Sequence, residues 1–143
     1  MLKNIPSILS PDLLKYLCEM GHSDKLVIAD ANFPAHSMAK NARVVRMDGH
    51  GVCDVLKGIL YLMPLDSYVS KSVKLMEKVK GDNADVSIWD EFKKILNEND
   101  YDSNIIENID RFDFYDLAKD AYLIIATGEK ALYANIILQK GVI

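Results

Sequence analysis

The sequence predicts an α/β fold, a single domain over residues 1–143 with helices layered around a central mixed sheet. Segments with helical periodicity alternate with short apolar runs along the chain, which is typical of layered α/β folds. The 143 residues fit one domain and hold no internal repeat or low-complexity tract. Half of the residues are hydrophobic and 27% are charged, so the composition is that of a globular domain.

The first helix is predicted to begin at Pro11, a residue that suits the first helical position. Ser10 can cap this helix, and the carboxylate of Asp12 favours the positive end of the helix dipole. Gly21 is expected to end it in the left-handed conformation. Apolar residues recur at helical spacing between these signals, at Leu13, Leu14, Leu17 and Met20.

The remaining elements follow from changes in the period of the apolar residues. Short apolar or alternating runs predict strands at 26–29, 44–45, 73–79, 105–109, 122–126 and 135–139. Apolar residues at helical spacing predict further helices at 52–62, 86–97 and 112–121. The segment ANFPAHSMAKNA, residues 31–42, has the composition of a loop.

The composition argues against several classes of binding partner. The formal net charge is −4, and the 17 basic residues are scattered among 21 acidic ones, so neither nucleic acid nor an anionic membrane is expected as a partner. The apolar residues near the N-terminus are interrupted by Asn4, Pro6 and Ser7, which argues against a signal-peptide core, and no stretch is apolar enough to span a bilayer. Cys18 and Cys53 are expected to be free thiols in a reducing, cytoplasmic environment.

Two polar residues flank the strand predicted at 26–29. His22 lies before the strand, and Asp30 follows its carboxyl end, where α/β folds tend to place ligand sites. Each residue also has a structural interpretation, since His22 could cap the helix and Asp30 could cap a loop. Because both flank one short strand, we treat them together as candidates for a functional site.

Other polar residues carry the same two interpretations. Asp66 in MPLDSY could form a turn, and Arg111 before the aromatic run FDFY could pack its stem on a neighbouring ring. Tyr133 and Asn135 bracket one residue at the start of the last predicted strand and so should face the same side. They could bind the hydroxyl groups of a ligand or simply link strands. Met76 lies in a predicted strand, where core packing is the default.

The chain has no motif of several common chemistries. It contains no GxGxxG, P-loop, GxSxG or HExxH sequence. The acidic run GDNAD, residues 81–85, does not have the ligand spacing of an EF-hand loop. The three histidines are far apart in sequence and do not argue for zinc. We therefore expect neither a metal nor a cofactor.

The segment GHSDKLVIADANFPAHS, residues 21–37, resembles the signature of the L-fucose mutarotase / D-ribose pyranase family. The resemblance continues through MDGHGVCDVLKGIL, PLDSYV, the tryptophan-containing helix, RFDFYDLAKDAYLIIATGE and LYANIILQKG, and so covers nearly the whole chain. It implies an α/β layered fold, a monosaccharide substrate, isomerase activity without a cofactor, and closed homo-oligomers that are decameric rings in bacterial members. The sugar site is then expected near a subunit boundary.

The resemblance also implies roles for individual residues. His22 matches the acid/base histidine of the family, and Asp66 matches a second catalytic carboxylate described for the fucose branch. The substrate-contact positions of the family correspond here to Asp30, Met76, Arg111, Tyr133 and Asn135. Ser23 and Ala134 stand where fucose mutarotases more often have glycine, and the latter feature also occurs in pyranases. Arg111 and ANFPAHS favour L-fucose over D-ribose, because pyranases tend to carry histidine at the arginine position.

The chemistry that this resemblance implies is the interconversion of sugar anomers. The hydroxyl on the anomeric carbon loses a proton, the ring oxygen gains one, and the open aldehyde recloses on its other face. Histidine suits this task because imidazole titrates near neutral pH. We expect His22 to protonate the ring oxygen, and Asp66, directly or through water, to take the anomeric proton. A non-catalytic sugar-binding module is the alternative, and it would need neither group.

Overall fold

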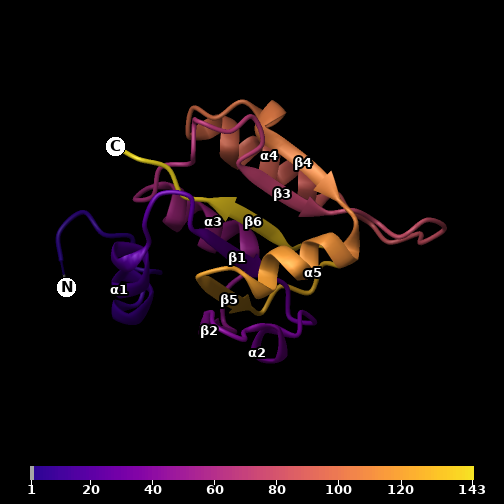
Figure 1. Cartoon of the computed structure of the whole chain (residues 1–143), viewed down its shortest axis with the longest axis horizontal. Helices are drawn as coiled ribbons and strands as arrows, with labels where there is room; N and C mark the ends of the chain where they lie inside the picture. Colours follow the sequence, from indigo (N-terminus) through magenta and orange to yellow (C-terminus); the bar gives the residue numbers. More distant parts are fainter. Residues whose placement is uncertain (1) are drawn as a thin grey trace.

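The computed structural model describes residues 2–143, which form a six-stranded sheet with helices on both faces (Figure 1). The strands are β1 Lys25–Ala29, β2 Arg43–Met47, β3 Val73–Met76, β4 Ile106–Ile109, β5 Leu123–Thr127 and β6 Ile136–Gln139. The helices are α1 Pro11–Glu19, α2 Ala35–Met38, α3 Val52–Leu60, α4 Ile88–Glu98, α5 Arg111–Lys119 and a 3₁₀ turn, Ser103–Ile105. The predicted α/β class is confirmed.

The sheet is mixed, as predicted. Its strand order is β2-β5-β1-β6-β3-β4. Strand β5 runs parallel to both β1 and β2, and β3 runs parallel to β4. Strand β6 runs antiparallel to its two neighbours, β1 and β3. As a result, the start of β6 lies beside the end of β1, and the end of β6 lies beside the start of β1.

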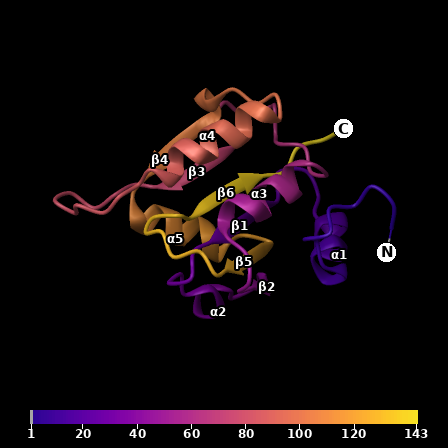
Figure 2. The same ribbon diagram turned by 180° about the vertical axis from the view of Figure 1, so that it is seen from behind.

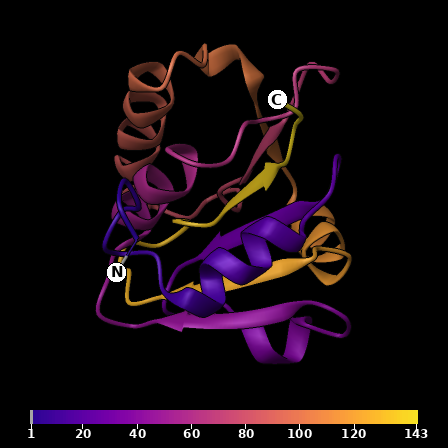
Figure 3. The same ribbon diagram turned by 90° about the vertical axis from the view of Figure 1, so that its left-hand side faces the viewer.

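Different helices cover the two faces of the sheet. Along β1, Leu26 and Ile28 point into a core shared with α1, α3 and α4. Val27 and Ala29 point to the other face, into a smaller core shared with α2 and α5. This alternation is the period of two that a strand imposes. Figures 2 and 3 show the resulting layers, with α4 and α5 on opposite sides of the strands.

The first helix begins as predicted but ends differently. The hydroxyl of Ser10 accepts a hydrogen bond from the backbone N–H of Leu13 at 3.2 Å, so the cap is confirmed. The helix ends at Met20, whose backbone is extended with a ψ of 133°, so the expected left-handed ending at Gly21 is wrong. The left-handed residue of this turn is Ser23, with a φ of 68°. The N–H of Ser23 donates to the carbonyl of Lys140, which directs the chain into β1.

Two further predictions differ from the structure. The strand expected over 73–79 ends at Met76, because Met76 pairs with Ile109, the last residue of the neighbouring β4. Residues 77–87 instead form a long loop that projects from the body of the molecule (Figure 1). The segment expected to be a loop contains the short helix α2, where the carbonyl of Ala35 accepts from Ala39.

Two other properties of the described chain bear on earlier expectations. Among residues 2–143, no helix combines the length and the apolar character needed to cross a bilayer. Cys18 is exposed and Cys53 is half-buried, and both are free. Burial raises the pKa of the Cys53 thiol to about 11.

Candidate active site

The candidate residues form two groups at opposite ends of β1. His22 precedes this strand and Asp30 follows it. Because β6 is antiparallel to β1, Asn135 lies at the Asp30 end and Gln139 at the His22 end. Five residues of strand span about 13 Å, since each step adds about 3.3 Å. Within one chain, the two groups therefore lie at opposite ends of β1 and do not form a single site.

The first group lines a cavity of about 210 Å³, which we call the Asp30 pocket. It brings together every residue predicted to contact a substrate, namely Asp30, Met76, Arg111, Tyr133 and Asn135. Five further residues complete the lining, namely Asn32, Phe33, Asp82, Tyr115 and Leu132. The pocket combines carboxylate, guanidinium, phenol and amide groups with aromatic and aliphatic walls, a composition suited to a small polar ligand.

Asp30 is the buried carboxylate of this pocket and is 5% exposed. Its Oδ1 accepts from the backbone N–H of Asn32, and its Oδ2 accepts from the side-chain amide of Asn135. Burial raises the pKa of Asp30 above its ordinary value, and these hydrogen bonds oppose the shift. The loop behind it is fixed because the N–H of Ala31 donates to the carbonyl of Glu129. Asp30 thus meets both interpretations made from sequence, since it caps a turn and faces the pocket.

Tyr133 has an unusual backbone conformation, with a φ of 57°. Residues with a side chain seldom adopt positive φ, and such positions often occur at functional sites. The indole Nε1 of Trp89 donates to the carbonyl oxygen of Tyr133 at 3.0 Å and helps to hold this conformation. Tyr133 therefore lies outside β6, and the side chains of Tyr133 and Asn135 meet at the pocket through a turn rather than through strand alternation.

Arg111 and Met76 line the pocket from two other elements. Arg111 is the first residue of α5, which the side chain of Asp110 caps through the N–H of Phe112. Its guanidinium carbon lies 4.9 Å from the centre of the Phe112 ring, so it is the charged head of Arg111 that approaches the neighbouring ring. Met76 is buried at the end of β3 and belongs to the smaller core.

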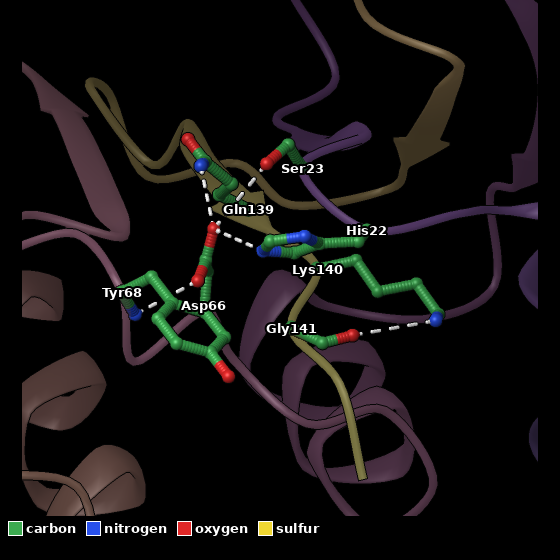
Figure 4. Close-up of polar contacts among 7 residues, drawn as sticks. All are labelled: His22, Ser23, Asp66, Tyr68, Gln139, Lys140 and Gly141. Atoms are coloured by element: carbon green, nitrogen blue, oxygen red, sulfur yellow. Dashed lines mark hydrogen bonds and ion pairs between the residues drawn. The ribbon is translucent and has the colours of Figure 1, made fainter.

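The second group surrounds Asp66, which is 3% exposed, and we call it the Asp66 cluster (Figure 4). Asp66 Oδ1 accepts from the backbone N–H of Tyr68 at 2.9 Å. Asp66 Oδ2 accepts from the amide of Gln139 at 2.8 Å and lies 3.2 Å from His22 Nε2. A carboxylate only accepts hydrogen bonds, so Nε2 of His22 carries the proton of this contact. The N–H of Tyr68 is the main cause of a lowered Asp66 pKa, and the bonds from Gln139 and His22 add to it.

His22 is the exposed member of this cluster, with 43% of its side chain accessible. The edge of its ring packs against Tyr68, with ring centres 5.5 Å apart. The other ring nitrogen, Nδ1, remains available to a ligand, since Nε2 faces Asp66. The hydroxyl of Ser23 approaches the same carboxylate oxygen at 3.5 Å. The arrangement is that of a histidine oriented by a buried carboxylate.

Three contributors were not identified from sequence. Gln139 and Tyr68 hold Asp66, and Asp82 lines the Asp30 pocket. Tyr68 lies within the PLDSYV segment already noted, and Asp82 lies within GDNAD. Gln139 has no local signal, because its position depends on the antiparallel pairing of β6. Within residues 2–143, no three potential metal ligands of the His, Cys, Asp or Glu type are grouped.

Comparison with known proteins gives a full-length match to one family. The model of the RbsD / FucU transport protein family matches residues 3–143. A relative named L-fucose mutarotase, from Actinobacillus pleuropneumoniae serotype 5b, is 45% identical over 142 residues, covering 99% of this chain and 97% of its own.

Among the solved structures that this chain resembles, one contains L-fucose and another contains D-ribose. The fucose mutarotase of Streptococcus pneumoniae in complex with L-fucose is 50% identical, covers 99% of both chains and superposes with a TM-score of 0.94. The RbsD protein of Bacillus subtilis complexed with D-ribose is 29% identical, covers 100% of this chain and 99% of its own, and has a TM-score of 0.77. The fold is shared with both, and the similarity is greater to the protein that binds L-fucose.

Proposed function

The chain belongs to the RbsD / FucU transport protein family, and from this premise we propose that it is an isomerase that interconverts the α and β anomers of free L-fucose. The observation that carries the proposal is the convergence of the five substrate-contact candidates on the Asp30 pocket. A 50% identical protein was solved with L-fucose bound, which supports the same ligand class here.

The Asp30 pocket offers complementary partners for sugar hydroxyls. The guanidinium of Arg111 supplies several donors in a fixed fork, and the carboxylate of Asp30 supplies acceptors. Asn135 is committed through its Nδ2 and Oδ1 to Asp30, so its main task is to hold that carboxylate. Met76 and Phe33 offer apolar surface to the carbon atoms of the ring. We assign these residues to substrate binding.

The Asp66 cluster supplies the proton-transfer group. We assign His22 to protonating the ring oxygen through Nδ1 while Nε2 stays bonded to Asp66. The sequence suggested that Asp66 takes the anomeric proton, but its donors and lowered pKa make it a weak base. We therefore assign Asp66 to orienting His22 and stabilising the imidazolium. One positioned acid or base of this kind contributes about 10² to 10⁴ in rate.

Asp30 is the better candidate for the base. Its raised pKa means that its carboxylate holds a proton more readily than Asp66 does. Its Oδ1 accepts from the N–H of Asn32 and its Oδ2 from the amide of Asn135, and because a carboxylate oxygen can accept more than one hydrogen bond, a sugar hydroxyl can still bind there. We propose that Asp30 binds the anomeric hydroxyl and accepts its proton as the ring opens.

The separation of the two groups supports a site shared between subunits. Exposed apolar residues border each group, with Tyr68, Val69, Val142 and Ile143 near the Asp66 cluster, and Val79, Phe112 and Leu132 near the pocket. These two surfaces differ, so a contact between them is heterologous and closes into a ring when the rotation allows. We propose a closed homo-oligomer in which His22 of one copy completes the pocket of the next. The decamer expected from the family resemblance is one such assembly.

Two other functions compete with this proposal, namely ribose pyranase activity and non-catalytic sugar binding. Ribose pyranase activity is disfavoured because the similarity to the ribose-bound relative is lower and because Arg111 occupies a pocket position. A non-catalytic sugar-binding module would use the Asp30 pocket but would gain nothing from the His22–Asp66 pair. We propose a cytoplasmic location, where the free thiols of Cys18 and Cys53 would persist.

Exchange NMR of sugar anomers tests the function directly. Saturation transfer between the α and β signals of L-fucose is expected to increase on addition of the purified protein, and transfer in D-ribose is expected to respond less. The buffer reaction, measured without protein, is subtracted. Strong acceleration for ribose with none for fucose would reverse the choice of substrate, and no acceleration for either sugar would favour the binding module.

A further inference from the structure

The loop over residues 77–87 lines the Asp30 pocket with Asp82 and is hydrogen-bonded to Tyr133 of the same pocket. After β3 this loop runs away from the sheet and returns at α4 (Figures 1 and 2). The hydroxyl of Tyr133 donates to Asp82 Oδ2 at 2.5 Å, and the backbone N–H of Val79 approaches the same hydroxyl at 3.4 Å. Asp82 also accepts from the N–H of Ala84 through Oδ1 at 2.9 Å, which fixes the carboxylate within the loop.

The hydrogen bond to Asp82 decides what Tyr133 offers a ligand. A phenol has one proton to donate, and an ionised carboxylate can only accept. The proton of Tyr133 is therefore committed to Asp82, and its oxygen can only accept further hydrogen bonds. The N–H of Val79 provides one of these at a long 3.4 Å, and the remaining acceptor capacity is open to a ligand hydroxyl. The Asp82 carboxylate raises the pKa of Tyr133, so the phenol stays protonated, and Tyr133 in turn lowers the pKa of Asp82.

We propose that Asp82 is a positioning residue that makes Tyr133 a hydrogen-bond acceptor for a hydroxyl of the bound sugar. The inference rests on the proposed function and deepens it. Arg111 donates on one side of the same pocket, and Tyr133 directed by Asp82 accepts on another, so a hydroxyl-bearing ring is oriented by both. The loop over 77–87 thereby takes part in substrate recognition through the Asp82–Tyr133 hydrogen bond, although it contributes no catalytic residue.

A pair of matched variants tests this role. In Asp82→Asn the charge is lost and the side-chain oxygen must serve both Tyr133 and Ala84, so the tyrosine proton is held weakly. We expect KM for L-fucose to rise about fivefold with kcat little changed, since a charge-assisted bond is about twice as strong as a neutral one. Asp85→Asn is the control, because Asp85 caps Ser87 in the same loop and does not line the pocket.

Two further measurements separate positioning from a structural role. With carbon-13 at the tyrosine ζ position, and the Tyr133 signal assigned by its loss in Tyr133→Phe, the pKa of Tyr133 should fall towards the ordinary value in Asp82→Asn but not in Asp85→Asn. In a Tyr133→Phe background, Asp82→Asn should add no further rise in KM, because its effect passes through the missing hydroxyl.

The outcomes distinguish this inference from the function on which it rests. Unchanged KM in Asp82→Asn, in a protein whose parent accelerates fucose exchange, would overturn the inference and leave the function standing. A full further rise in KM in the Tyr133→Phe background would also overturn it, since Asp82 would then act independently of Tyr133. A parent that neither binds nor exchanges L-fucose would remove the proposed function and the inference together.

Discussion

Asn135 and Asp30 are joined by two hydrogen bonds that run in opposite directions between the ends of β6 and β1. The backbone N–H of Asp30 donates to Asn135 Oδ1 at 2.9 Å, and Asn135 Nδ2 donates to Asp30 Oδ2 at 2.7 Å. Both residues are buried, with exposures of 5% for Asp30 and 4% for Asn135. One amide therefore satisfies a buried donor and a buried acceptor at the centre of the pocket.

Replacing Asn135 with Ala is expected to lower the free energy of unfolding by about 1–3 kcal/mol, because it leaves buried polar groups of Asp30 without partners. The affinity for L-fucose should fall as well, since Asp30 loses the contact that orients it. Urea unfolding and a fucose titration measure the two effects. Asn104→Ala, at an exposed position, is the control and should change stability by no more than about 0.5 kcal/mol. Equal stability of the two variants would contradict the role of Asn135.

The two carboxylates at opposite ends of β1 should affect stability with opposite signs as pH changes. The pKa of Asp30 is raised by burial, so its contribution is fully present below the unfolded pKa of about 3.9 and is lost as pH rises through the folded pKa. The pKa of Asp66 is lowered, chiefly by the N–H of Tyr68, so its contribution is present above about 3.9 and is lost as pH falls through the folded pKa.

Urea unfolding across a pH series measures these opposite pH dependences. The quantity to compare is the free energy of unfolding of the parent minus that of each variant. Against Asp30→Asn, the stability advantage of the parent should shrink as pH rises from about 4. Against Asp66→Asn, the advantage should shrink as pH falls below about 4. Parallel pH dependences for the two variants would show that the local environments described for these carboxylates are wrong.

The sequence predicted which residues line the Asp30 pocket better than it predicted how the backbone places them there. Asp30 could be recognised because it follows a short apolar strand, and Tyr133 and Asn135 because polar groups bracket one residue. Alternation along a strand was the wrong reason for the latter pair, since Tyr133 adopts a left-handed conformation before β6 begins. Backbone conformation of this kind depends on a distant partner, the indole of Trp89, which no local pattern reveals.

The separation of His22 from Asp30 follows from the strand that lies between them. Both flank β1, which favours treating them together, although the five residues of this strand hold its two ends about 13 Å apart. The position of Gln139, by contrast, could not be predicted from local patterns, because Gln139 reaches Asp66 only through the antiparallel pairing of β6 with β1. Strand order and direction arise from non-local pairing, and a period of two carries no information about either.

The left-handed backbone at Ser23 leads to a prediction about stability. Ser23→Val should destabilise the fold by about 1–2 kcal/mol, because a side chain branched at Cβ fits this conformation poorly. Ser23→Gly should stay within about 1 kcal/mol of the parent, since relief of strain and the entropy of the unfolded chain oppose each other. Thermal or urea unfolding of the two variants measures the difference. Equal stabilities would contradict a cost of the left-handed backbone at position 23.

Replacing His22 with Gln tests catalysis against binding. Glutamine keeps a hydrogen-bonding group of similar reach but does not titrate near neutral pH, so fucose exchange should fall about 10²- to 10⁴-fold. Affinity should change by about 1 kcal/mol at most, the value of one hydrogen bond. The exposed His36→Gln is the matched control and should behave as the parent does. A folded His22→Gln protein with full activity would favour the sugar-binding module.

Mixing inactive variants tests whether each site is shared between copies. His22→Gln damages only the Asp66 cluster, and Asp30→Asn damages only the pocket, so each homo-oligomer is expected to be inactive. In mixed oligomers formed at equal ratio, about one site in four joins an intact His22 from one copy to an intact pocket on the next, if the contacts are heterologous. Co-expression with two affinity tags isolates the mixed species, and exchange NMR measures the recovered activity.

A second pair of variants, both damaged in the Asp66 cluster, is the control for the mixing experiment. His22→Gln and Asp66→Asn both damage the Asp66 cluster, where the two residues of one chain are in contact at 3.2 Å. A mixed oligomer of these two variants has no copy with an intact His22–Asp66 pair, so its activity should not exceed that of the more active variant alone. Recovery with the first pair and not with the second would mean that His22 and Asp66 act from one chain on the pocket of another. Absence of recovery with both pairs, in oligomers shown by their tags to be mixed, would contradict a shared site.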